Sequence, residues 1–221
     1  MKQVIKKIVA KHPRIKSLRI RVINFLGNND KSSKYNIAST VILKNLKIND
    51  CGNGNKIIVG ENSRLNNCTF RFYGNNNTVQ IGENCILSSM NVWIEDDNNE
   101  ISLGDATTIH GETNLACIEG TRIEIGKDCM LSSYIHFRTG DSHSVIDMQG
   151  ERINRSKDIQ IGNHVWIGQN VFVGKGSSVA DNSVVGAYAV VTKQFDVTNA
   201  ALAGNPAKII KEKIDWRRER I

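Results

Sequence analysis

The stretch 159-IQIGNHVWIGQNVFVGKGSSVADNSVVGAYAVVTK-193 decides the fold. Apolar residues recur in it at every sixth position, a period that fits neither a helix of 3.6 residues per turn nor a strand with a repeat of two. They are Ile161, Ile167, Val173, Val179, Val185 and Val191. A chain that turns a corner after each short strand, and closes after three corners, has this period. We therefore expect a prism of triangular coils of roughly eighteen residues, with one apolar residue per side stacked inward.

A second, longer repeat precedes this stretch. Its glycines lie 22 residues apart and their neighbours keep the same register. These glycines are Gly60, Gly82, Gly104 and Gly126. Asn55, Asn77 and Asn99 also align and are followed by Thr121, which predicts corners bent through left-handed or side-chain-bonded turns. A coil of 22 residues also suits a right-handed parallel β-helix, but the strict sixes after residue 159 favour the left-handed triangular form.

The sequence thus predicts an all-β solenoid, a left-handed parallel β-helix over residues 55–200. The repeat is lost over 138–158, a polar segment that we expect to leave the prism as a loop. Long irregular excursions from a regular scaffold are commonly functional. Residues 201–221 are expected to form a turn and a short C-terminal helix, because apolar and charged residues alternate there with helical spacing.

Residues 1–54 are expected to be an amphipathic helical region and a lead-in, with helices over 2–12 and 14–26 separated by Pro13. The net charge of the chain is +7, but residues 1–31 hold nine Lys or Arg and one Asp, so the remainder has a net charge of −1. The prism itself therefore has no basic field for nucleic acid. The basic helical region could instead lie on an anionic membrane, cover the open end of the prism or contact a neighbouring subunit.

Five cysteines, with no Cys-x-x-Cys spacing and no secretory signal ahead of them, favour unpaired thiols in the cytoplasm. Cys85 and Cys129 occupy the same small-residue position of the repeat as Ser63 and Thr107, which indicates interior packing and not a metal site. No metal is expected. An apolar run of about eighteen residues is also missing from the sequence, so we expect no membrane span.

Four motifs in a fixed order connect the chain to a known family: 141-DSH-143, 165-VWIG-168, 191-VTK-193 and 203-AGNPAK-208. In this order the chain resembles the bacterial hexapeptide-repeat acetyltransferases, in the branch that O-acetylates sugars and polysaccharides such as capsule or O-antigen. The similarity covers about residues 55–212 and is strongest to enzymes of polysaccharides, including sialic acid capsules. It implies a cytoplasmic homotrimer of parallel prisms, possessing an acetyl-CoA site in the groove between two of them.

Transfer of an acetyl group from a thioester to a sugar hydroxyl needs a base, because an alcohol is a weak nucleophile at neutral pH. His143 matches the catalytic histidine of the family and is our candidate for the general base. Asp141, Asp147 or a backbone carbonyl could orient its imidazole. Trp166 is expected beside His143, where it could shield the thioester and donate its indole N–H to the carbonyl oxygen, or pack at the subunit interface.

The resemblance also assigns a coenzyme groove, in which Lys193 and Lys208 would meet the phosphates as point charges and Ala187 would admit the pantetheine arm. Its full set is Trp166, Gly168, Gln169, Ala187, Thr192, Lys193, Asn205 and Lys208. Three other histidines have open roles. His136 could line the acceptor pocket or be structural, whereas His110 and His164 are expected to face outward.

Three other functions remain as alternatives. A zinc carbonic anhydrase with the same prism needs histidine pairs at a ligand spacing that this sequence does not have. N-acetylation of an amino sugar or nucleotide sugar would be expected to require a nucleotide-binding element, and residues 1–54 contain no phosphate-cradling glycine loop. A solenoid that only binds a ligand would not need the excursion that contains His143.

Overall fold

The computed structural model describes residues 13–27, 29 and 34–221. The predicted helix over 14–26 is confirmed as α2 (Pro13–Leu26), and the one predicted over 2–12 lies outside the described residues. Helix α2 covers the first coil, where the side chain of Asn24 accepts from the Leu43 N–H at 2.8 Å and donates to the Val41 carbonyl at 3.0 Å. Ile20 is buried, but Phe25 remains 88% exposed, so covering the prism uses only part of the apolar stripe.

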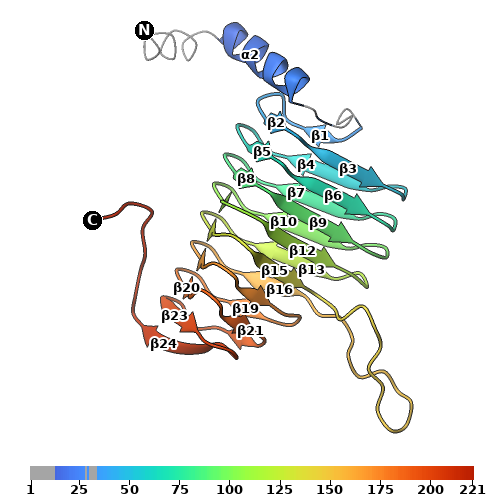
Figure 1. The fold of residues 1–221 in the computed structure, drawn as a ribbon, viewed down its shortest axis with the longest axis vertical. Helices are drawn as coiled ribbons and strands as arrows, with labels where there is room; N and C mark the ends of the chain where they lie inside the picture. The colour runs from blue at the N-terminus through green and yellow to red at the C-terminus, as the bar shows by residue number, and fades with distance from the viewer. Residues whose placement is uncertain (1–12, 28, 30–33) are drawn as a thin grey trace.

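Three parallel sheets form the walls of a triangular prism, and consecutive strands pass from sheet A to sheet B to sheet C (Figure 1). Sheet A contains β1 (Asn36–Ile37), β4 (Lys56–Val59), β7 (Thr78–Ile81), β10 (Glu100–Leu103), β13 (Arg122–Ile125), β16 (Ile159–Ile161), β19 (Ser178–Val179) and β22 (Gln194–Phe195). Sheet B contains β2 (Ile42–Lys44), β5 (Arg64–Asn66), β8 (Ile86–Ser88), β11 (Thr108–Ile109), β14 (Met130–Leu131), β17 (Trp166–Ile167), β20 (Val184–Val185), β23 (Ala200–Ala203) and β24 (Lys208–Glu212). Sheet C contains β3 (Lys47–Asp50), β6 (Thr69–Phe72), β9 (Met90–Ile94), β12 (Thr113–Cys117), β15 (Ile135–Arg138), β18 (Phe172–Val173) and β21 (Val190–Val191).

One apolar residue per wall and per coil fills the interior, as the six-residue period predicts. All six residues of that period are buried. The wider N-terminal coils take larger side chains, and Phe70, Phe72 and Phe137 are fully buried there. Cys85 and Cys129 are also buried and unpaired, and burial raises the pKa of each thiol to about 11. These two cysteines are packing residues, as their position in the repeat indicates.

The predicted asparagine corner combines both expected kinds of turn. Asn77 is fully buried and its side-chain oxygen accepts from the Asn99 N–H at 2.8 Å, while its amide donates to the Asp96 carbonyl at 3.0 Å. The left-handed residue is the one before each ladder position. These residues are Gly54, Asn76, Asn98 and Gly120, with φ between 55° and 71°. Each coil is therefore bonded to the next one through side chains that a strand ladder alone does not supply.

Two boundaries differ from those expected. The solenoid begins at Asn36 and not near residue 55, because β1 to β3 pair with β4 to β6 although their sequence shows little of the repeat. The expected C-terminal helix is wrong: Lys208–Glu212 is a strand that pairs antiparallel with β23. Since β23 is the last parallel strand of its sheet, pairing of its free edge outweighs the weak helical spacing of the segment. Residues 213–221 form no helix and run back along the prism (Figure 1).

The expected excursion leaves the prism after β15 and returns at β16 (Figure 1). It departs from the edge between sheets C and A, because β15 belongs to sheet C and β16 to sheet A. Its base is fixed to the wall: Arg152 forms an ion pair with Glu119, and the Ser156 N–H donates to the same carboxylate at 3.1 Å. Arg152 holds the pKa of Glu119 near 2, so this anchor is charged at neutral pH.

Candidate active site

The loop that carries His143 is organised by a buried asparagine. Asn154 donates from its amide to the His143 carbonyl at 2.7 Å and to the Asp141 carboxylate at 2.9 Å. Its side-chain oxygen accepts from the Val145 N–H at 2.8 Å. Lys175, from the next coil, forms an ion pair with Asp141 and donates to the Asn154 carbonyl at 3.0 Å. Both strands of the loop are thus held where His143 emerges.

His143 itself is exposed and uses only its backbone for these contacts. Across the residues that the structure describes, its ring has no hydrogen-bond or ion-pair partner. The expected orienting group, Asp141, is bonded instead to Lys175 and Asn154, which hold the pKa of its carboxyl below the usual value. Asp141 therefore helps to hold Asn154, whose side chain bonds the His143 carbonyl and the Val145 N–H, and the imidazole is left free to meet a substrate.

Within one chain, Trp166 does not lie beside His143 but on the other side of the prism. It projects from β17 in sheet B, between Met130 and Val184 of the neighbouring strands, and is 37% exposed. Sheet B faces away from the edge between sheets C and A, where the loop departs. The physical reason is that the chain visits the three walls in turn. The 23 positions between His143 and Trp166 include the end of the loop and the whole of β16, so their distance in the sequence does not indicate which wall each residue reaches.

Six of the eight residues expected to bind the coenzyme follow sheet B and its edge with sheet C. They are Trp166, Gly168, Gln169, Ala187, Asn205 and Lys208. Successive turns stack closely there: a Cβ on Gly168 would lie 2.7 Å from the Ala187 nitrogen, and the Gln169 carbonyl accepts from the Tyr188 N–H at 2.9 Å. Ala187 and Lys208 are exposed. The small residues Gly168 and Ala187 thus lie in adjacent coils at this edge, and the exposed cation Lys208 follows on β24.

The other two, Thr192 and Lys193, lie on the loop side. Thr192 lines a hollow of about 430 Å³ together with Asp141 and Lys175. The ammonium of Lys193 stands 5.2 Å from the centre of the Phe195 ring. One chain therefore divides the expected coenzyme residues between two edges of the prism, and only one of these edges carries His143.

Comparison with known proteins supplies the missing identification. The family model described as bacterial transferase hexapeptide (six repeats) matches residues 158–193. A polysialic acid O-acetyltransferase of Neisseria meningitidis is 37% identical over 189 residues, which are 85% of this chain and 87% of the relative. The chain belongs to the hexapeptide-repeat O-acetyltransferases. The crystal structure of the polysialic acid O-acetyltransferase OatWY matches 85% of this chain and 92% of its own, with 33% identity and a TM-score of 0.73.

A second solved relative, the polySia-specific acetyltransferase NeuO, covers 79% of this chain and 89% of its own, with 30% identity and a TM-score of 0.61. The prism is thus the left-handed parallel β-helix of this family, as the repeat predicts. Among the described residues, no group of three His, Cys, Asp or Glu side chains is placed to hold a metal ion. No helix in that part of the chain has both the length and the apolar character to cross a membrane.

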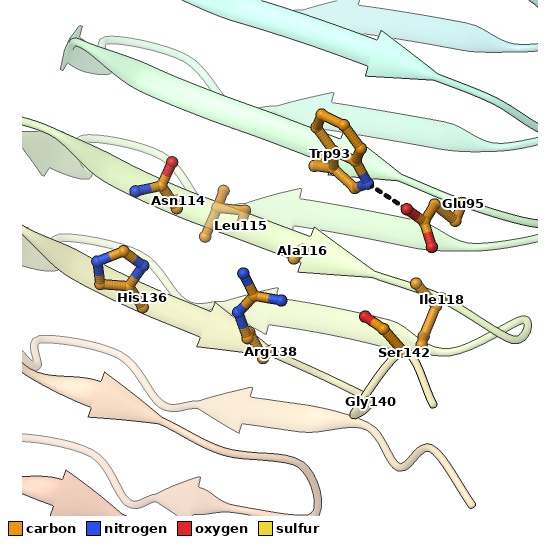
Figure 2. A pocket seen from close by; sticks show the side chains of 10 residues that line it. All are labelled: Trp93, Glu95, Asn114, Leu115, Ala116, Ile118, His136, Arg138, Gly140 and Ser142. Atoms are coloured by element: carbon orange, nitrogen blue, oxygen red, sulfur yellow. Dashed lines mark hydrogen bonds between the residues drawn. The ribbon is translucent and has the colours of Figure 1, made fainter. Parts of the chain in front are cut away.

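This hexapeptide-repeat enzyme also has a hollow of about 390 Å³ on sheet C, above the base of the loop (Figure 2). Trp93 and Ser142 lie on one side of it and His136 on the other, with Arg138 between His136 and Ser142. His136 is exposed, so it lines this hollow as one of its two expected roles requires. The hollow and the loop share Gly140 and Ser142, which places it next to the expected site of acetyl transfer.

The C-terminal tail is a part of the site that the sequence did not predict. Trp216 stacks on His164 with ring centres 4.2 Å apart and lies 6.1 Å from the ring of Trp166. Arg218 donates to the Asp128 carboxylate at 3.0 Å and to the Thr108 hydroxyl at 2.9 Å. Tail and sheet B therefore share the surface around Trp166. A helix was expected over these residues, and no local signal reports a contact across 52 positions.

His164 joins the C-terminal tail to the prism through hydrogen bonds of both its ring nitrogens. Its Nδ1 lies 2.7 Å from the Asp128 carboxylate and its Nε2 lies 3.0 Å from the Trp216 carbonyl. Both partners only accept, so both nitrogens must donate, which requires the imidazolium. Burial opposes this charge, but these two bonds and the carboxylates of Asp128 and Asp215 raise the pKa of His164 above its usual value. Arg218 faces the same Asp128 and adds to the cationic side of the cluster.

Tail docking is therefore expected to weaken as pH rises. A raised folded-state pKa gives stability that is complete below about 6.5 and is lost as pH passes the folded value. We expect amide hydrogen exchange of residues 214–218 to be faster at pH 8.5 than at pH 6, after correction for the intrinsic exchange rate. His164→Gln should abolish this difference, whereas His110→Gln, on an exposed histidine of the same prism, should keep it. Equal corrected exchange at both pH values in the parent protein would contradict the assignment.

Proposed function

We propose that this enzyme transfers acetyl groups from acetyl-CoA to hydroxyl groups of an acidic capsular polysaccharide of the polysialic acid type, in the cytoplasm. The proposal is carried by the similarity to the Neisseria meningitidis enzyme, which extends over 85% of this chain and includes the loop with His143. Free sugars and neutral polymers are then poor acceptors. The ester is formed on oxygen, and this separates the reaction from N-acetylation.

The residues along sheet B fit an extended thioester coenzyme. Gly168 and Ala187 have no bulky side chain that would block the coenzyme from lying against sheet B, and Lys208 offers an exposed cation for phosphate. Bound there, acetyl-CoA supplies the activated acetyl group. The exposed imidazole of His143 takes the proton from the acceptor hydroxyl as the oxygen forms its new bond to the acetyl carbon, and afterwards the proton can pass to the departing thiolate. Trp166 covers the reacting group and excludes water.

We propose further that this site is complete only in a homotrimer of parallel prisms. The support is the placement of His143 and Trp166 on opposite sides of one chain. Around a threefold axis, the loop edge of one protomer faces sheet B of the next, so His143, Thr192 and Lys193 meet the wall that contains Trp166 and Lys208. All eight residues expected to bind the coenzyme then line one groove.

Acetyl transfer to a panel of acceptors tests the proposal. Purified protein is mixed with acetyl-CoA and with polysialic acid, free sialic acid, a neutral polysaccharide or no acceptor, and thiol release is followed. We expect release with polysialic acid and a product that carries acetyl groups by mass spectrometry. Mild base should remove these groups, because O-acetyl esters are cleaved under conditions that leave N-acetyl amides intact. A failure of millimolar acetyl-CoA to raise the Tm, together with no thiol release, would reject the proposal.

A further inference from the structure

The outer surface of sheet C has a register that aligns its side chains in columns. Residues that face outward alternate with the buried ones on each strand, and those of adjacent strands pair directly. In one column Arg71 pairs with Trp93, Trp93 with Ala116, and Ala116 with Arg138. The column thus runs from the N-terminal coils to the strand from which the catalytic loop departs.

The strands of this surface carry basic side chains, and the acidic residue of the hollow, Glu95, follows β9 and is bonded to Trp93. In strands β3, β6, β9, β12 and β15, which are fully described, the outward positions hold Lys47, Arg71, His136 and Arg138 and no acidic residue. Sheet A offers a contrast, because its outward positions at the same level include Glu100 and Glu124 beside Arg122. An acidic polymer is therefore attracted to sheet C and not to sheet A.

Trp93 adds a rigid apolar surface to the column. Its ring contacts Tyr73 with centres 4.9 Å apart, the guanidinium of Arg71 lies 5.9 Å from it, and its Nε1–H donates to Glu95 at 2.7 Å (Figure 2). Even so, Trp93 is 41% and Tyr73 45% exposed. An exposed indole fixed by its neighbours suits the apolar face of a sugar ring, since it presents a large area with little entropy left to lose.

This surface continues into the reaction site. Trp93 and Arg138 line the hollow of about 390 Å³ that reaches Ser142, the residue before His143 (Figure 2). Arg71 and Arg138 are three strands apart, which corresponds to about 14 Å at the usual spacing between strands. That span exceeds one sugar ring. A ligand that contacts both guanidiniums while it presents a hydroxyl to His143 must therefore contain several sugars.

We propose that the column Arg71–Trp93–Arg138 is a binding track for an acidic glycan chain, which holds the sugars that flank the acetylated one. The inference rests on the proposed function and adds to it the subsite and a dependence on acceptor length. The carboxylates of the glycan pair with Arg71 and Arg138, and a sugar face lies on Trp93. Short acceptors reach His143 without the track and lose its contribution to binding.

Direct binding of labelled polysialic acid tests the track without any need for turnover. We expect Trp93→Ala and Arg71→Ala each to weaken the binding of a long chain by about tenfold, which corresponds to the loss of one stacking or charged contact. Arg71→Lys should recover part of the loss. A disialic acid fragment should bind equally to all of these proteins. Arg122→Ala, which removes an exposed arginine from sheet A, is the matched control and should bind like the parent protein.

Two outcomes overturn the track: equal affinity of Trp93→Ala and the parent protein for the long chain, or no binding of that chain to the parent protein. The binding measurement is independent of catalysis, and we expect the same affinities when each protein also carries His143→Ala. A parent protein that binds the long chain at the track but does not acetylate it would reject the proposed function and leave the track in place.

Discussion

His143→Ala is expected to lower kcat for acetyl transfer by about 10²–10⁴-fold, the usual contribution of a general base, while acetyl-CoA still binds. The physical reason is the free imidazole. Loop geometry depends on the His143 carbonyl, which Asn154 bonds, and an alanine retains that carbonyl. The ring is exposed and has no partner among the described residues, so its removal creates no cavity and leaves no buried group unsatisfied.

The measurement combines steady-state transfer to polysialic acid with the thermal shift produced by acetyl-CoA. The same Tm without ligand, the same shift with ligand and a large loss of kcat would identify a chemical role. His110→Ala serves as a control, because His110 is also exposed and follows β11 on sheet B, two strands before β17 with Trp166. His136→Ala is a second comparison, on the histidine that lines the hollow. Full transfer by His143→Ala with normal coenzyme binding would exclude His143 as the base.

The repeat was the part of the fold that the sequence could predict. Each inward position of a coil needs an apolar residue of limited size, so a period of six or 22 is written directly into the chain. Asn77 shows the same for a corner, since its N–H donates to the Asn55 side chain and its own side-chain oxygen accepts from the Asn99 N–H, at the equivalent positions of adjacent coils. The first coil was missed because β1 to β3 contain little of this pattern. They are ordered by pairing with β4 to β6, a tertiary effect.

Contacts between distant parts of the chain explain what could not be predicted. Asn154 bonds His143 across 11 positions, and Lys175 bonds Asp141 across 34 positions. In the sequence, each of the two resembles an ordinary surface residue. Trp216 reaches His164 across 52 residues, although a helix was expected there. The motifs did indicate which residue types belong to the site. They did not indicate the wall of the prism on which each residue lies, and that placement decides whether one chain can form the site.

Two inactive variants are expected to restore activity when they assemble together, which is the second large effect. If His143 of one protomer works with Trp166 of the next, His143→Ala and Trp166→Ala each disable every groove of their own trimer. A mixed trimer contains grooves in which the loop comes from the Trp166→Ala chain and the wall from the His143→Ala chain. Each mixed trimer contains one complete groove out of three, whichever variant supplies two of its chains, so mixed trimers freed of both homotrimers should recover about a third of the parent activity.

The experiment co-expresses the two chains with different affinity tags and purifies the mixed trimers through both tags in turn. A matched control pairs His143→Ala with a chain that carries both substitutions, in which no combination gives a complete groove, and this mixture should stay inactive. The separate placement of the loop edge and sheet B in one chain requires complementation if the two residues act together. Mixed trimers that are no more active than either variant would show that His143 does not share a groove with Trp166 of a neighbouring protomer. The coenzyme wall would then have to be sought on the loop side of the same chain, around Thr192 and Lys193.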